Sequence, residues 1–382
     1  MYWVNFLHLY QPPTQNEETL TRIIDESYRL IIKLLYTYPN LKLTLNISGS
    51  LLDLLEKYKH EDIINEIKQF VEKQRIELVG SAMYHPILPL LPVKEVDRQI
   101  KLNSEICKKF FGSSYNPSGY FLPEMAYSKE VADVIKKNGF SWIILDELHL
   151  QEKIDPSVRY TIKDNGLVAI FRNREISRMF PPEYIIKDVT DLHIKYLITA
   201  HDGEMYGHWH KEDRGFYEKV FTSKYITTIT ASEYIKMLST EKEITPRQAS
   251  WESTLDELEQ NIYYGLWYSP KNKIHKKLWE LLRFANAQID MYEQDKNYIP
   301  ARKHFDKGLA SCSWWWASGK KLDGWRPEIW NPSEIEKGAQ ELLNTVRSLD
   351  DNSSKDTIKA EKLYNQIRDM IWEKHWKSTE TK

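Results

Sequence analysis

Short apolar segments alternate with amphipathic segments over roughly the first 240 residues. The apolar segments predict strands, and the stretches between them, with apolar residues three and four positions apart, predict helices. Such alternation indicates an α/β fold in which helices cover a parallel sheet. About eight strands are expected, which is enough for a barrel or a near-complete one. These strands are residues 2–8, 41–47, 76–79, 119–122, 141–145, 167–171, 194–199 and 225–229. The helices expected between them are residues 16–38, 49–58, 61–74, 94–110, 129–138, 209–220 and 232–238.

The pattern changes after about residue 255, where helical spacing continues without a convincing strand. Residues 271–292, 333–349 and 355–376 are expected to be helices. We therefore predict two domains. Residues 1–260 form the catalytic barrel, and residues 261–382 form a C-terminal helical domain that covers the cleft.

Polar side chains follow several predicted strands directly. His8 ends the first strand and His85 follows the third. Glu124 and Asp202 follow the strands at 119–122 and 194–199. Because the carboxyl ends of parallel barrel strands open on one face, and that face carries the active site, we expect these residues to converge there.

Glu124 and Asp202 each have a purely structural interpretation. Glu124 follows Pro123 in a turn, and Asp202 precedes Gly203 in an Asp-Gly turn. Together, however, they supply the pair of carboxylates that glycoside hydrolysis requires, one near the anomeric carbon and one acid on the leaving oxygen. We therefore predict that both are catalytic.

A metal site is the rival interpretation of the segment around Asp202. Histidines and carboxylates crowd into ten residues there and would suit a divalent ion, as in a metal-dependent carbohydrate deacetylase. The spacing matches no standard ligand set, and no HExxH motif is present. We therefore expect no metal or other cofactor. The residues concerned are His201, Asp202, Glu204, His208 and His210.

Composition narrows the class of protein. Hydrophobic residues make up 41% and charged residues 28% of the 382 residues, with a net charge of −2, so the chain is a globular protein without the basic excess that nucleic-acid binding needs. Two cysteines cannot build a disulfide framework. Residues 1–10 lack a signal-peptide pattern and no run of 18 apolar residues occurs, so we expect a cytoplasmic protein that does not enter the membrane. The 13 Trp and 23 Tyr suit a large core, and also suit stacking on sugar rings.

Four motifs occur in a fixed order: His8–Pro12 (HLYQP), Val79–Leu91 (VGSAMYHPILPLL), Gly119–Glu124 (GYFLPE) and Asp202–Trp209 (DGEMYGHW). Together they resemble the conserved regions of glycoside hydrolase family 57, and the resemblance extends more loosely to Ala310–Ser318 (ASCSWWWAS). It implies an incomplete TIM-like (β/α)7 barrel with a C-terminal helical region. It also implies retaining chemistry on α-glycosides, with Glu124 on the position of the nucleophile and Asp202 on that of the acid/base.

The resemblance also suggests residues that bind substrate. His8 and His85 would hydrogen-bond sugar hydroxyls, and Gln11 is a further candidate. Tyr10 stands where the family usually has a second histidine, so one sugar contact differs. We expect the pKa of Asp202 to be raised by burial and by the charge of Glu124. The aromatic candidates for stacking on sugars are Trp209, Trp251, Trp314, Trp315 and Trp316.

The substrate is an α-linked glucan or oligosaccharide on this interpretation. Hydrolysis and transfer share the glycosyl-enzyme, so an α-amylase type and a 4-α-glucanotransferase type both remain open. An α-galactosidase-like hydrolase and a non-catalytic sugar-binding relative are further alternatives, although such a relative usually loses one of the two carboxylates.

Overall fold

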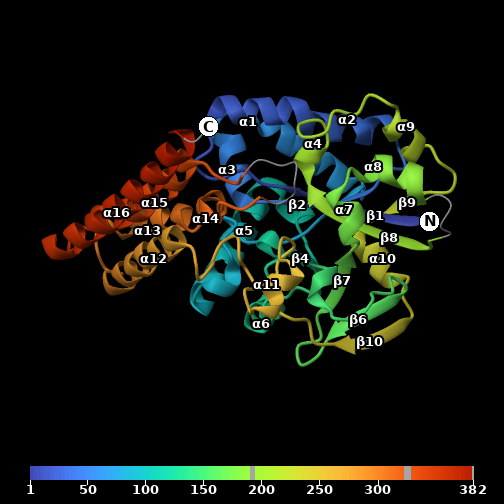
Figure 1. The fold of residues 1–382 in the computed structure, drawn as a ribbon. Helices are drawn as coiled ribbons and strands as arrows, with labels where there is room; N and C mark the ends of the chain where they lie inside the picture. Colours follow the sequence, from blue (N-terminus) through green and yellow to red (C-terminus); the bar gives the residue numbers. More distant parts are fainter. Residues whose placement is uncertain (190–193, 322–327, 381–382) are drawn as a thin grey trace. The chain divides into compact units, whose positions relative to one another are not determined.

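The computed structural model describes residues 1–189, 194–321 and 328–380 (Figure 1). The chain divides into two compact units, and each is described by itself. The first comprises residues 1–11, 15–83 and 88–251, and the second comprises residues 12–14, 84–87 and 252–382. No helix in the described stretches combines the length and the apolar composition that a membrane crossing requires.

Parallel strands form a ring in the first unit. Strand β1 (Tyr2–Leu9) pairs with β2 (Leu43–Ile47) on one side and with β8 (Tyr196–Asp202) on the other. Strand β2 pairs with β3 (Ile76–Leu78), and a parallel bridge between Gly80 and Tyr120 continues the order to β4.

The other half of the ring begins at β4 (Gly119–Phe121), which pairs with β5 (Trp142–Asp146). Strand β5 pairs with β7 (Val168–Arg172). The backbone N–H of Asn173 then donates to the carbonyl of Ile198, which joins β7 to β8. Within the described residues the seven parallel strands thus follow one another as β1-β2-β3-β4-β5-β7-β8, which confirms the predicted (β/α)7 barrel.

Three further strands lie outside this ring. Strand β9 (Thr227–Ile229), which was predicted, pairs with the start of β1. Strand β6 (Val158–Ile162) runs antiparallel to β7, and β10 (Thr240–Ile244) pairs with β6. The sequence analysis missed β6 and β10. Four of the five residues of β10 are exposed, so this strand has no apolar run to reveal it.

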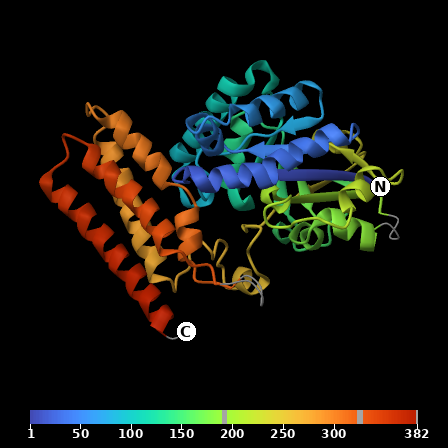
Figure 2. The ribbon, with the colours of Figure 1, turned by 90° about the horizontal axis from the view of Figure 1, so that it is seen from above.

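Helices cover the ring strands, which explains why β1, β2 and β5 are almost continuously buried and why β1 and β5 are largely apolar. Helices α1 and α2 lie over β1 and β2 (Figures 1 and 2). A π-helical segment, Ile24–Tyr28, separates these two helices, so the single helix predicted over 16–38 has an irregular centre. The helices of this unit are α1 (Glu17–Ile23), α2 (Arg29–Thr37), α3 (Gly49–Lys57), α4 (Glu61–Glu72), α5 (Val93–Phe111), α6 (Lys129–Lys137), α7 (Arg174–Arg178), α8 (Pro181–Tyr184), α9 (Phe216–Phe221) and α10 (Ala231–Lys236).

The helix predicted over 209–220 is wrong in its first half, because α9 begins only at Phe216. The preceding residues form a folded-back loop instead. In this loop the backbone N–H of Trp209 donates to the carbonyl of Glu204, and that of Gly207 donates to the carbonyl of His210. The second of these hydrogen bonds occupies the carbonyl of His210, which a helix over these residues would need.

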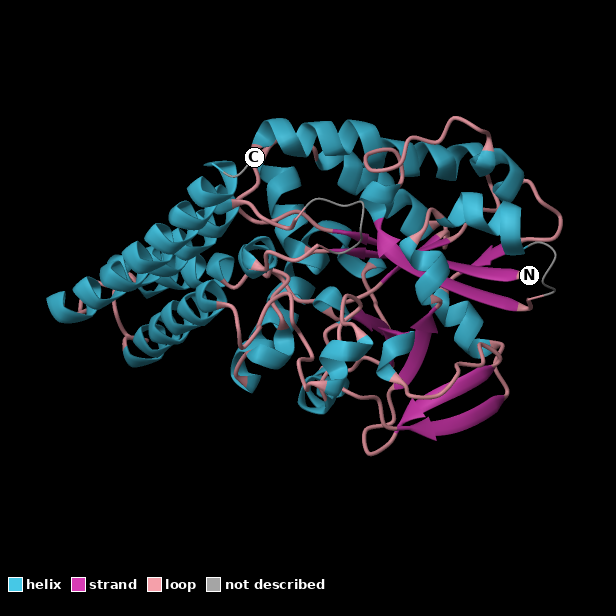
Figure 3. Ribbon diagram, in the orientation of Figure 1, coloured by secondary structure: helices cyan, strands magenta, loops and turns pink. Residues whose placement is uncertain are grey.

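The named elements of the second unit are all helices among its described residues, and loops join them (Figure 3). Its three long predicted helices are confirmed as α12 (Lys273–Met291), α15 (Pro332–Ser348) and α16 (Ser354–Glu380). Helices α11 (Leu255–Glu259), α13 (Tyr298–Gly308) and α14 (Cys312–Ala317) were not predicted. Helix α13 approaches α15 closely at Gly308, where a β-carbon would lie 2.6 Å from the side chain of Leu342.

Candidate active site

His8 marks the face of the barrel at which the strands end. Its Cα is in register with Asn46 of β2 and with Asp202 of β8, so these three strands end at the same level. The imidazole is 3% exposed, and its Nδ1 lies 2.6 Å from Oδ1 of Asn46. Burial lowers the pKa of His8 to about 4, so the ring is neutral at physiological pH. The ring stacks on Phe121, the last residue of β4, at 4.5 Å between centroids.

Glu124 lies in a 3₁₀ turn, Pro123–Met125, immediately after β4. Its backbone is in the left-handed region, with φ 58° and ψ 17°, and that of Met125 has φ 48°. Two consecutive non-glycine residues in this region store backbone strain, a feature that clusters at active sites. Pro123 and Met125 are buried, whereas Glu124 is half-buried, and the turn keeps its carboxylate at the strand-end face.

Trp251 contacts Glu124 twice. Its backbone N–H donates to the Glu124 carbonyl at 3.0 Å, and its indole Nε1–H donates to Oε2 of the carboxylate at 2.7 Å. The indole is 6% exposed and lies edge-on to His8 and Phe121, at 6.2 and 5.8 Å between centroids. The structure therefore brings three predicted site residues together, namely His8, Glu124 and Trp251.

Asp202 ends β8 with an exposed side chain, so the burial that we expected to raise its pKa is absent. The buried acid of this segment is Glu204, which is 5% exposed. Oε1 of Glu204 accepts hydrogen bonds from the Tyr28 hydroxyl at 2.6 Å and from Nε2 of Gln11 at 2.8 Å. Burial, followed by the negative charge of Asp202, raises the pKa of Glu204 to about 7. Gln11 is therefore engaged with this buried acid.

The π-helical segment Ile24–Tyr28 holds the loop that carries these acids. Besides the Tyr28 contact, Ser27 donates to the carbonyl of Gly203 at 2.9 Å, and Glu26 lies 2.5 Å from Nδ1 of His208. Gly207 has φ 93°, and a β-carbon there would lie 2.0 Å from the carbonyl oxygen of Glu26. The extra residue of a π-bulge thus turns three consecutive side chains toward one loop, a use that recurs at functional sites.

For the remaining predicted residues the structure gives the surroundings within their own unit. Trp209 is 68% exposed on the loop after β8. The other four belong to the second unit, where Trp316 is half-buried. His85 is 1% exposed there, with Nδ1 3.1 Å from the Ser311 hydroxyl. Trp315 is half-buried, whereas Trp314 is 1% exposed and packs on Trp279 at 4.7 Å, so the ring of Trp314 has no surface to offer a sugar.

The crowded histidines and carboxylates do not form one ligand set. His208 pairs with Glu26, and the ring of His210 stacks on Phe180 at 4.0 Å. Nδ1 of His201 lies 2.9 Å from the carbonyl of Asp202, and burial lowers the pKa of His201 to about 4. In the described part of the chain, no three His, Cys, Asp or Glu side chains gather in a metal-binding arrangement.

A buried charge cluster, which was not predicted, lies at the ends of two neighbouring strands. Asp146 is the last residue of β5, Arg172 is the last residue of β7, and Arg174 follows two positions later. Asp146 and Arg172 are 0% and 3% exposed. A sequence signal was present, because each of these apolar strands ends on a charged residue, and buried charges require partners.

The ring of seven parallel strands, with carboxylates at its strand ends, places the protein in the class of incomplete TIM-like barrels. The sequence profile of Glycosyl hydrolase family 57 matches residues 2–248, and the chain belongs to this family. It is 26% identical over 253 residues to an α-amylase of Pyrococcus horikoshii, covering 62% of this chain and 39% of that protein. It is 24% identical over 252 residues to a 4-α-glucanotransferase of Thermococcus litoralis, covering 62% and 38%. The chain thus spans about two fifths of the length of these relatives.

Solved structures show the same fold. The T. litoralis 4-α-glucanotransferase superposes with a TM-score of 0.72 at 19% identity, over 91% of this chain and 60% of that one. A family 57 branching enzyme of Pyrococcus horikoshii superposes with a TM-score of 0.72 at 16% identity, over 97% and 95% of the two chains. At these identities the likeness concerns the fold.

Proposed function

We propose that the protein acts on α-linked oligo- or polysaccharides with retention of configuration, through a covalent glycosyl-enzyme. The observation that carries this proposal is the placement of Glu124 on a strained turn at the strand-end face, with its carboxylate fixed by Trp251. Asp202 ends a strand of the same ring. The α-amylase and 4-α-glucanotransferase relatives support the choice of α-glucans as the substrate class.

In the proposed mechanism the ionised carboxylate of Glu124 attacks the anomeric carbon, and the bond from that carbon to the leaving oxygen breaks. Asp202 gives its proton to the leaving oxygen. In the second step Asp202 takes a proton from water or from a sugar hydroxyl, which attacks the anomeric carbon and releases Glu124. Glu204 lies close enough for its charge to interact with that of Asp202, so its protonation state tunes the field in which Asp202 works.

The proposed sugar contacts follow from chemistry and exposure. His8 is neutral and suited to hydrogen-bond a hydroxyl, and His85 and Gln11 stay in the proposal as polar contacts. Trp209 presents most of its indole to solvent, and Trp315 presents part of it, so both suit stacking on a pyranose face. We withdraw Trp314 from the proposed contacts because its ring is in the core of its unit.

The products formed from purified maltoheptaose test this proposal. Shorter sugars alone identify a hydrolase, and shorter and longer sugars together identify a glucanotransferase. Conversion of an α-galactoside alone identifies the galactosidase alternative. No conversion of either substrate contradicts the enzyme proposal and leaves a sugar-binding relative.

Two controls accompany this assay. Glu124→Gln is expected to abolish turnover, whereas Glu77→Gln, in a half-buried carboxylate of β3 that contacts Ser232, is expected to retain it. A chelator is expected to leave turnover unchanged. Loss of turnover on chelation would instead favour the metal-dependent deacetylase. We also propose a cytoplasmic location, supported by the two cysteines, Cys107 and Cys312, which form no disulfide and suit a reducing compartment. Cell fractionation tests it.

A further inference from the structure

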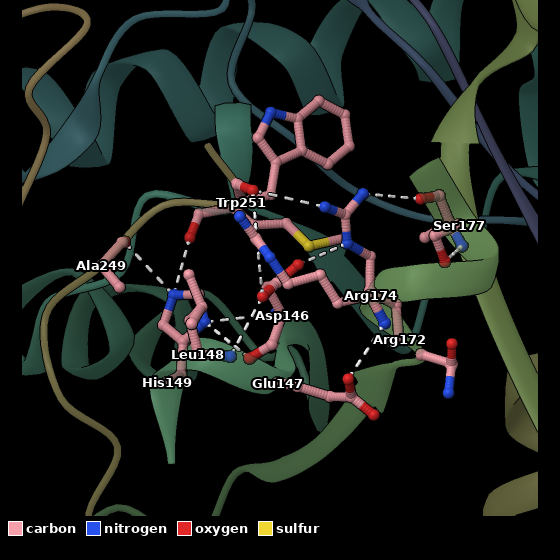
Figure 4. A network of polar contacts seen from close by, with 12 residues as sticks. Asp146, Glu147, Leu148, His149, Arg172, Arg174, Ser177, Ala249 and Trp251 are labelled. Carbon is pink, nitrogen blue, oxygen red and sulfur yellow. Dashed lines mark hydrogen bonds and ion pairs between the residues drawn. The ribbon is translucent and has the colours of Figure 1, made fainter. Parts of the chain in front are cut away.

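The buried cluster at the ends of β5 and β7 is built around Asp146. Arg172 donates from Nε to one carboxylate oxygen of Asp146 at 2.7 Å, and Arg174 donates to the other oxygen at 3.0 Å (Figure 4). Burial opposes ionisation of Asp146, but the two guanidinium groups outweigh it and lower the pKa of this carboxyl. The cluster therefore carries one negative and two positive charges inside the barrel unit.

Both arginines also donate hydrogen bonds to Trp251. Arg174 donates to the Trp251 carbonyl at 2.5 Å and Arg172 donates to the same oxygen at 3.4 Å. The Arg172 guanidinium also lies 4.8 Å from the centroid of the indole ring, within cation–π range. Arg172 is fixed from a third side by the carbonyl of Ala200 in β8, at 2.8 Å. The backbone and the ring of Trp251 are thus both held by groups from the barrel strands.

His149 fastens the two segments that meet here. It is 0% exposed, and its Nε2 lies 3.0 Å from the carbonyl of Met125 and 3.2 Å from that of Ala249 (Figure 4). Both partners of Nε2 are carbonyls, which only accept, so Nε2 carries a proton and donates, while Nδ1 lies 2.8 Å from the carbonyl and 3.1 Å from the backbone nitrogen of Asp146. Met125 follows Glu124, and Ala249 precedes Trp251 by two positions. His149 therefore holds together the segment that carries Glu124 and the segment that carries Trp251.

We propose that Asp146, Arg172 and Arg174 position the carboxylate of Glu124 by holding Trp251, whose indole N–H orients Oε2. This inference rests on the proposed role of Glu124 as the nucleophile. A buried ion cluster is weak evidence for stability, because apolar residues of similar volume can be as stable. A rigid cluster does, however, hold Trp251, which contacts Glu124 directly, and so keeps the carboxylate within the narrow range of positions that a nucleophile requires.

Trp251→Phe tests the last link, because it keeps an aromatic ring and removes the N–H donor. A hydrogen bond to a carboxylate stabilises the ionised form, so its loss raises the pKa of Glu124. We expect a rise of about one pH unit. The measurement is a ¹³C NMR titration of labelled glutamate carboxyls, with the Glu124 signal assigned from its absence in Glu124→Gln. Trp3→Phe is the matched control, because Trp3 is 0% exposed and donates to Thr199 at 2.9 Å within the same unit.

Arg174→Met tests the contact between the charge cluster and Trp251. Arg174→Lys, which keeps the positive charge and a hydrogen-bond donor, is the conservative variant. Arg174→Met is expected to move the Glu124 titration in the same direction as Trp251→Phe and to lower kcat with little change in KM. Arg174→Lys is expected to recover at least half of the shift. An unmoved Glu124 titration in both Trp251→Phe and Arg174→Met overturns the inference, whatever their effect on stability.

A separate experiment isolates the proposed function. Glu124→Ala should be inactive on an aryl α-maltooligosaccharide and should regain turnover with azide, which takes the place of the missing nucleophile and yields a glycosyl azide. If Glu124→Ala retains turnover, the nucleophile assignment fails, and the inference fails with it. If azide rescues Glu124→Ala but the titration in Trp251→Phe is unmoved, only the positioning inference fails.

Discussion

The hydroxyl of Tyr28 lies 2.6 Å from Oε1 of Glu204, so a side chain of the π-helical segment donates to the buried acid next to Asp202. This hydrogen bond favours the ionised form of Glu204 and opposes the burial and the charge of Asp202, which together raise its pKa to about 7. The local geometry of one helix thereby sets the charge of a group two residues from the proposed acid/base.

Tyr28→Phe is expected to raise the pKa of Glu204 further, because it removes that donor and leaves the burial unchanged. The measurement is a ¹³C NMR titration of the glutamate carboxyls, with the signal assigned from Glu204→Gln. Tyr217→Phe is the matched control, since the buried Tyr217 hydroxyl has no hydrogen-bond partner among the described residues. An equal shift in both variants would show that the Tyr28 contact is not its cause.

Glu204 also makes stability depend on pH. Its pKa is raised from 4.5 to about 7 on folding, so between these values the folded protein binds more protons than the unfolded chain. The contribution of Glu204 to stability therefore falls as pH rises through this window, by about 3 kcal/mol in all. We expect Glu204→Gln to remove this contribution. The free energy of unfolding of the variant should therefore increase, relative to that of the wild type, as the pH rises from 4.5 to 7.

Urea unfolding across that range measures the difference between the two proteins. The comparison must be differential, because the buried histidines act in the opposite sense. The pKa values of His8 and His201 are lowered to about 4, so their contribution to stability is lost as pH falls below 6.5. Parallel curves for wild type and Glu204→Gln would contradict the raised pKa of Glu204.

The barrel strands could be predicted from sequence because both of their faces are buried. Strands β1 and β5 consist of nearly continuous apolar residues, and this pattern does not depend on what packs against them. Strand β10 (TEKEI) is held by its backbone pairing with β6. Its side chains are mostly exposed, so their pattern does not predict this pairing. The π-helical segment has ordinary helical periodicity in its sequence, so its extra residue is visible only in the structure.

The candidate site was predictable where chemistry follows a strand directly, as at Glu124 and Asp202. The partners of these residues were not. Arg172 contacts Asp146, 26 positions away in the sequence, and Trp251, 79 positions away. Contacts over such sequence separations depend on how the ring of strands closes. The stacking of Trp251 on a sugar stays a prediction, and its contact with Glu124 could not be predicted, because the chemistry of a single residue does not reveal the partner of an indole N–H.

Gly207→Ala tests whether the π-helical segment must approach the loop closely. The new β-carbon would lie 2.0 Å from the backbone oxygen of Glu26, and φ is 93°. We expect a loss of ~3 kcal/mol in the free energy of unfolding and a reduced kcat, because the loop carrying Asp202 and Glu204 must shift. Gly215→Ala is the control, since φ there is 73° but no atom lies within 4 Å of the new carbon, and ~1 kcal/mol is expected. Equal losses in urea unfolding would show that conformational strain alone accounts for Gly207.

Trp209→Ala separates sugar binding from folding. The indole is 68% exposed, so its removal is expected to change the free energy of unfolding by less than about 0.5 kcal/mol. If the ring stacks on a sugar, the loss of roughly 1 kcal/mol of aromatic contact raises KM for maltoheptaose about five- to tenfold. Tyr225→Ala, at a ring that is 69% exposed in the same unit, is the matched control and should leave KM unchanged. A KM that stays at the wild-type value in Trp209→Ala would remove Trp209 from the proposed substrate contacts, whereas a selective rise would place a sugar subsite beside the loop that follows β8.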